Sequence, residues 1–140
     1  MNAWLGFALG AAVLYGLHQV FTKLASASAS DGLGGFIVEA SAAGTIGVYL
    51  FLLYLSSKWD QHADTRGVLY SIATGLCVGL GTIFFFRMFQ RGGPLSAAPL
   101  VLALGSAIMA FAGVVVFNEP FTIRHVVGVG MSMLAILLLR

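Results

Sequence analysis

The last third of the chain begins with Arg91-Gly92-Gly93-Pro94, continues as an apolar run to Phe117, and passes through Asn118-Glu119-Pro120 into a second apolar run that ends at Leu139. Each run has roughly the 20 residues that a helix needs to cross a hydrocarbon core about 30 Å thick. Proline at the start of a helix costs no backbone hydrogen bond, so Pro94 and Pro120 are suited to begin the two helices. The segment therefore predicts a membrane helical hairpin with a very short turn.

The composition of the whole chain indicates the same class. Of the 140 residues, 59% are hydrophobic and 9% are charged, and the mean hydropathy is +0.98. A soluble domain carries roughly a quarter of charged residues. Long unbroken apolar runs favour helices over a β-barrel, so we expect an all-α membrane protein. The net charge of +2 is too small to suggest a nucleic-acid partner, and the single cysteine, Cys77, excludes an internal disulfide.

Five apolar runs fill the chain, and we expect one transmembrane domain over residues 1–140. The first run resembles a secretory signal, but no Lys or Arg precedes it and polar residues interrupt its far end, so we expect a retained helix. A linker of small residues follows it, and Asp31 is suited to cap the second helix. A polar connector, residues 56–66, follows the second run. The expected helices span residues 3–25, 33–55, 67–88, 95–117 and 121–139.

The basic residues are almost evenly divided between the two sides of the membrane. With five spans, one side carries Lys58, Arg66 and Arg124, and the other carries Lys23, Arg87, Arg91 and Arg140. Orientation follows the imbalance of Lys and Arg between short loops, and here the imbalance is small. Two interpretations stay open. Local signals fix one orientation, or the chain inserts both ways and pairs with an inverted copy of itself, which reproduces the inverted-repeat plan of many transporters.

Several motifs resemble those of EamA-type proteins of the drug/metabolite transporter superfamily, over the whole length of the chain. The residues that carry the resemblance are Trp4, Tyr15-Gly16, Lys23, Gly92-Gly93-Pro94-Leu95-Ser96-Ala97-Ala98-Pro99, Phe117-Asn118-Glu119-Pro120-Phe121-Thr122 and Gly128. Most members of the family carry two inverted five-span repeats. This chain has one, and so it resembles the half-size members that work as dimers. The resemblance implies export or uptake of small solutes through a central cavity lined by the first, third and fourth helices.

Polar residues inside the expected spans are the candidate site. Tyr15, His18, Gln19 and Thr22 fall on one side of the first helix. Glu39 lies about two turns inside the second helix and Arg87 about one turn from the end of the third, in the same half of the membrane. A carboxylate at that depth must pair, protonate or face a wet cavity. Glu39 and Arg87 are at comparable depth, so we expect that they can form an ion pair. The candidate substrate or coupling-ion residues are Tyr15, His18, Gln19, Glu39 and Arg87.

Simpler roles stay open for individual residues. Lys23 and Arg87 lie near enough to helix ends to snorkel to the lipid headgroups, and His18 is suited to hydrogen bonding between packed helices. Glu119 beside the short turn is most simply a solvated cap of the fifth helix. The sequence shows no metal-ligand spacing, phosphate loop or nucleophile–base pairing, so we expect no enzyme, metal or cofactor. His62, with Asp60 and Asp64, reads as a polar loop.

Two functions follow from these features. The first is a small-solute transporter of the cell membrane, the inner membrane in a Gram-negative source, that works by alternating access. It would be a dimer, preferably an antiparallel homodimer, or would pair with a related five-helix chain. The second is an accessory membrane subunit that scaffolds another protein and transports nothing. Buried His and Gln side chains on the first helix favour transport, because a scaffold has little need of them.

Overall fold

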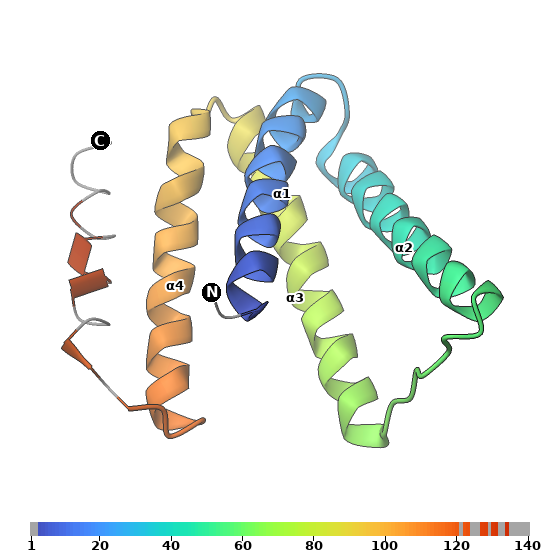
Figure 1. Ribbon diagram of the computed structural model, residues 1–140. Coiled ribbons are helices and arrows are strands. Elements are labelled where there is room, and N and C mark those ends of the chain that lie inside the picture. The colour runs from blue at the N-terminus through green and yellow to red at the C-terminus, as the bar shows by residue number, and fades with distance from the viewer. Residues whose placement is uncertain (1–2, 121, 124–126, 129, 132–133, 135–140) are drawn as a thin grey trace. The chain divides into compact units, whose positions relative to one another are not determined.

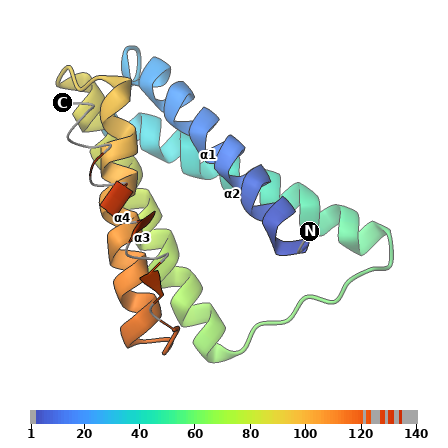
Figure 2. The same cartoon turned by 60° about the vertical axis from the view of Figure 1, so that its left-hand side comes forward.

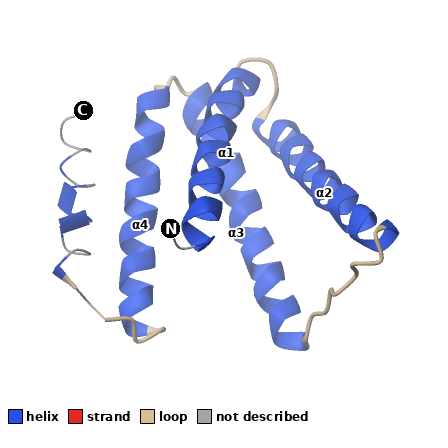
Figure 3. Cartoon of the chain, in the orientation of Figure 1, coloured by secondary structure: helices blue, strands red, loops and turns tan. Residues whose placement is uncertain are grey.

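The computed structural model describes the chain except residues 1–2, 121, 124–126, 129, 132–133 and 135–140. The chain divides into two compact units, Met1–Gly92 and Gly93–Arg140. The first unit holds three helices, α1 (Ala3–Ser26), α2 (Asp31–Leu55) and α3 (Thr65–Gln90). The second holds a 3-10 turn, η1 (Leu95–Ala97), followed by α4 (Ala98–Val115). Among the described residues the regular structure is entirely helical, as the colouring in Figure 3 shows.

In the first unit, α3 packs against both α1 and α2. Figures 1 and 2 show that α2 and α3 meet near the α1–α2 turn and diverge toward the connector that joins them at the other end. The buried residues follow this arrangement. In α2 they are Gly34 and Gly35, both in the first turns, and in α3 they are Thr82, Phe86 and Phe89, all near its end. The packed part of α2 and α3 is therefore confined to one end of the unit.

The second unit begins with a turn that proline shapes. Pro94 has an extended backbone and precedes η1, and Pro99 lies in the first turn of α4, where its missing N–H leaves no helical bond unmade. The fourth helix thus begins as a 3-10 turn. At the other end Asn118 adopts a positive φ of 52°, a conformation that asparagine tolerates better than most residues. It turns the chain back, so that the Glu119 N–H donates to the Gly113 carbonyl at 3.0 Å.

In the part of the chain that the structure describes, four helical segments are long and apolar enough to cross a membrane: Trp4–Ser26, Asp31–Leu55, Thr65–Gln90 and Leu95–Val115. Most of their large apolar side chains are exposed in the single chain. That pattern suits a protein whose surroundings are lipid, because lipid tails solvate leucine and phenylalanine as well as a protein core does. The chain is an all-α, multi-pass membrane protein. The fifth expected span, residues 121–139, lies largely outside the described residues.

Candidate functional site

The polar residues of α1 separate into an exposed and a buried group. Tyr15 is 67% exposed, and its ring meets the edge of the His18 ring at 6.5 Å between centroids. Gln19 and Thr22, one turn further along, are only 7% and 2% exposed. The expected stripe on one side of the helix therefore exists, but Tyr15 lies at its exposed margin. Gln19 and Thr22 form its buried part.

Three atoms of this stripe are buried without a hydrogen-bond partner among the described residues: His18 Nδ1, Gln19 Oε1 and Thr22 Oγ1. A buried polar group without a partner costs about 1–3 kcal/mol, so it needs an explanation such as a water, an ion or a ligand. His18, Gln19 and Thr22 are hereafter called the α1 polar face. In the second and third helices, Glu39 and Thr82 supply the corresponding polar groups. The Thr82 hydroxyl lies 2.6 Å from Glu39 Oε1 and also 3.0 Å from the Val78 carbonyl.

His18, at the inner end of the α1 polar face, and the Glu39–Thr82 bond lie at a similar depth. His18 is eight residues before the end of α1, Glu39 eight after the start of α2, and Thr82 eight before the end of α3. At 1.5 Å per residue each lies about 12 Å from the end where the three helices meet. That depth is close to the middle of a hydrocarbon core about 30 Å thick. Polar groups at this level are costly and are functional candidates by default.

The expected Glu39–Arg87 pair is wrong. Arg87 donates from Nε to Asp31 Oδ2 in the first turn of α2 and remains 60% exposed, whereas Glu39 accepts from Thr82. The reason is register. Arg87 is only three residues from the end of α3, while Glu39 is eight residues inside α2, so antiparallel packing places each beside a different partner. Asp31, expected to cap α2, instead lies in its first turn, and Ser30 precedes the helix.

Two further contacts close the same end of the first unit. The Gln90 side-chain amide donates to the Ala29 carbonyl at 2.8 Å, and Lys23 Nζ lies 5.1 Å from the centre of the Phe89 ring. Lys23 is half-buried, so snorkelling does not describe it completely. Sequence reasoning missed Asp31, Thr82 and Gln90 as partners. One signal in the sequence could have identified these partners. Residues counted forward from the start of α2 lie beside residues counted backward from the end of α3, because the two helices are antiparallel.

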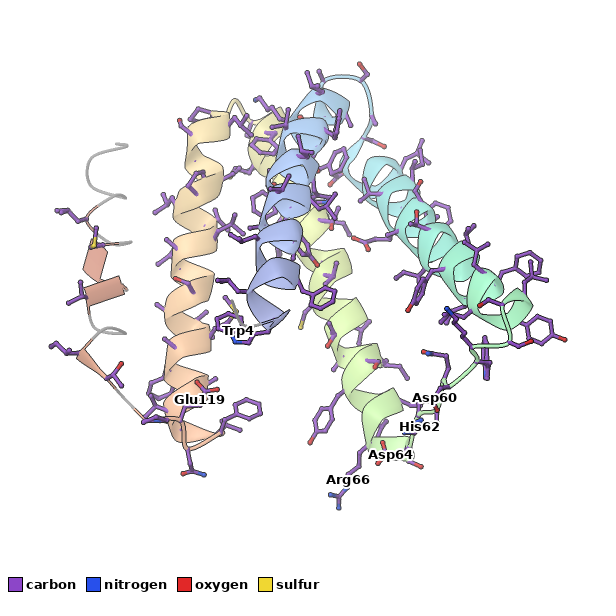
Figure 4. All side chains as sticks on the ribbon, viewed as in Figure 1. Trp4, Asp60, His62, Asp64, Arg66 and Glu119 are labelled. Carbon is purple, nitrogen blue, oxygen red and sulfur yellow. The ribbon has the colours of Figure 1, made fainter. Side chains whose placement is uncertain are left out.

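Within the first unit, the remaining sequence candidates lie apart from this site (Figure 4). Trp4 is exposed near the start of α1, and Asp60 and His62 lie in the exposed connector. Asp64 caps α3, since its Oδ1 accepts from the Gly67 N–H at 2.7 Å. In the second unit Glu119 folds back on α4. A Cβ added to Gly113 would lie 2.8 Å from Oε2 of Glu119, so only glycine fits at position 113 without a shift of the Glu119 side chain.

Among the residues that the structure describes, no three His, Cys, Asp or Glu side chains gather in a way that would hold a metal ion. The candidate site therefore consists of hydrogen-bonding groups and one carboxylate within an apolar helical unit. It defines the chain as a multi-pass membrane protein with polar groups buried inside its first helical unit.

The EamA-like transporter family model matches residues 2–140. The chain belongs to that family, as the motifs of its sequence indicate. No solved structure matches the chain.

Two bacterial proteins are similar to parts of the chain. It is 42% identical over 64 residues to the "Probable 4-amino-4-deoxy-L-arabinose-phosphoundecaprenol flippase subunit ArnE" of Serratia proteamaculans (strain 568), across 46% of this chain and 55% of the relative. It is 26% identical over 85 residues to the protein of the same name from Proteus mirabilis (strain HI4320), across 59% of this chain and 74% of the relative. The aligned part thus spans about half of the first relative and about three quarters of the second.

Proposed function

We propose that the chain is one half of a dimeric membrane transporter that moves its solute by alternating access. The observation that carries the proposal is the α1 polar face, whose buried acceptor atoms have no partner among the described residues. A solute that donates hydrogen bonds to these atoms, or a coupling cation that they coordinate, would satisfy them. Glu39, at the same depth, adds the charge that such a ligand would neutralise.

We assign the contact residues by their depth and burial. His18 and Gln19 would bind the solute directly, and Tyr15 would close over it from the exposed margin of α1. Glu39 would hold the coupling ion or a cationic group of the solute. Arg87, near the membrane surface, would receive an anionic group before the solute moves inward.

The relatives support a class of solute. Their names describe flippase subunits acting on a sugar joined to phosphoundecaprenol. We propose a lipid-linked sugar phosphate for this chain as well: the sugar would be held at the α1 polar face, and the lipid tail would stay in the bilayer. The word subunit in those names also supports a second chain in the working assembly.

The proposed assembly is two five-helix chains in antiparallel orientation in the cell membrane, each a single domain over residues 1–140. The near balance of Lys and Arg between the two ends of the helices supports this orientation. Antiparallel pairing places one α1 polar face from each chain around a shared central path, as inverted repeats do in larger transporters.

The test is transport by the purified dimer in liposomes loaded with a fluorescent phosphoundecaprenol-linked sugar. We expect Glu39→Gln to abolish movement between leaflets, while the variant keeps its thermal stability in detergent. Asp60→Asn, which removes a carboxylate from the exposed connector, is the matched control and should transport normally. Normal transport by Glu39→Gln would refute its role. A wild-type protein that moves no such lipid and co-purifies at a fixed ratio with another membrane protein would instead favour the accessory-subunit function.

A further inference from the structure

The contacts between α2 and α3 form a continuous series at one end of the first unit. From the surface inward they are the Gln90 bond to the Ala29 carbonyl, the Arg87–Asp31 pair, the packing of Phe86 on Gly34, and the Glu39–Thr82 bond. Each step forward along α2 is matched by a step back along α3. Beyond this series, α2 and α3 bury no residue along the rest of their lengths. The buried contacts between α2 and α3 are therefore confined to this end of the two helices.

The middle of the series is the tightest part. Phe86 is completely buried, and a Cβ added to Gly34 would lie 2.7 Å from Phe86 Cζ and closer still to Cε1. At Gly35 an added Cβ would meet Ile83 at 3.4 Å, which is ordinary contact. The ring of Phe86 is thus shielded completely from solvent and lies in close contact with the Gly34 backbone.

The outer part of the series is polar, and its ion pair between Arg87 and Asp31 can break and form again. Arg87 reaches Asp31 through Nε alone, and its side chain is 60% exposed. An exposed ion pair of this kind contributes little to the stability of a fold. It can therefore open and close without unfolding the unit. An apolar plug behind a weak, exposed ion pair is the arrangement expected of a gate.

We propose that the first turns of α2 and the last turns of α3 form a gate, which this structure shows closed. Asp31 and Arg87 are its latch, and Phe86 seated on Gly34 is its plug. The gate lies between the membrane surface and the level of His18 and Glu39, each eight residues, or about 12 Å, from the end of its helix. This inference rests on the proposed transport function, because a gate regulates access to that site. When the latch releases, α3 moves away from α2 and the plug leaves Gly34.

The test measures access to the gate without any substrate. In a Cys77→Ser background, a cysteine replaces Gly35, inside the closed series, and is labelled in liposomes with a membrane-impermeant maleimide. We expect slow labelling in the otherwise native chain and labelling several-fold faster in Asp31→Asn and in Arg87→Gln. The charge exchange Asp31→Arg with Arg87→Asp should restore slow labelling. A cysteine in place of Ser28, in the exposed α1–α2 turn, should label at one rate in every background.

Equal labelling at position 35 in all four backgrounds would overturn the gate. So would fast labelling in the charge exchange, because a latch depends on the attraction between the two charges and not on either residue alone. Thermal unfolding in detergent distinguishes release from misfolding, since a released gate leaves the unfolding temperature nearly unchanged. Labelling that follows the latch in a protein that moves no lipid-linked sugar would retain the gate and reject the proposed solute.

Discussion

At the scale of single residues, two neighbouring glycines in α2 have opposite requirements. Gly34 faces the buried ring of Phe86, and Gly35 faces Ile83 at ordinary contact distance. Alanine is a better helix former than glycine by up to about 1 kcal/mol. Helix propensity alone therefore predicts that alanine would stabilise the protein at both positions. The packing of Phe86 from α3 reverses this preference for alanine at Gly34.

We expect Gly34→Ala to destabilise the protein by about 1–3 kcal/mol, because the new methyl group overpacks a ring that has no space to move into. Gly35→Ala should be neutral or slightly stabilising. Thermal unfolding of the two variants in the same detergent compares them directly. Equal stability would mean that α2 and α3 are not in close contact at Gly34.

The Thr82 hydroxyl is the second residue-scale feature that can be tested. Thr82→Val keeps the shape of the side chain but removes the donor to Glu39, leaving a half-buried carboxylate without its partner. We expect a loss of about 1–3 kcal/mol and reduced transport. Thr82→Ser keeps the hydroxyl and should retain both properties. A valine variant as stable and active as the serine variant would show that the bond has no role.

At the scale of helices, the start of α3 is fixed by a side-chain cap. Asp64 Oδ1 accepts from the Gly67 N–H at 2.7 Å, one of the backbone donors that a helix start leaves unpaired. We expect Asp64→Ala to lower stability by about 1 kcal/mol, and Asp64→Asn to lower it much less, because asparagine also caps helices well. Circular dichroism during thermal unfolding measures both. If the Asp64→Ala variant is as stable as the Asp64→Asn variant, the side-chain cap does not stabilise the start of α3, and the position of that start is set by the bilayer instead.

The sequence predicted the helices better than it predicted their partners. Apolar runs of the right length indicated α1 to α3, and polar spacing indicated His18 and Gln19, because both signals are local along one helix. The pairs Asp31–Arg87 and Glu39–Thr82 join residues 56 and 43 positions apart in the chain. They depend on the register between two helices, which tertiary packing sets and composition does not record. Sequence reasoning therefore joined Glu39 to the wrong residue.

At the scale of the whole molecule, the proposed antiparallel dimer depends on weakly specified insertion. The connector carries Lys58 and Arg66, while the opposite ends of the helices carry Lys23, Arg87 and Arg91. Such a small difference should leave both orientations populated. A thiol label introduced in the connector should therefore react from both faces of the membrane in similar amounts.

Positive charge added to the connector should favour one membrane orientation over the other. We expect Asp60→Lys with His62→Lys to place the connector predominantly in the cytoplasm, because Lys and Arg in short loops set orientation. Asp60→Asn is the control and should change little, since acidic residues contribute little to the rule. Face-specific labelling of a connector cysteine measures both. A connector found on one face in the native chain would require an oppositely inserted, related partner.

The connector also determines how far the free ends of α2 and α3 can separate. Nine residues lie between Leu55 and Thr65, and a fully extended chain of that length reaches roughly 30 Å. The connector therefore sets an upper limit on the divergence of α2 and α3 that is visible in Figure 2, where it runs from one helix end to the other. Its length becomes an adjustable mechanical stop: each residue removed shortens the reach by about 3.4 Å, and a sufficiently short connector would restrain the two helices at both ends.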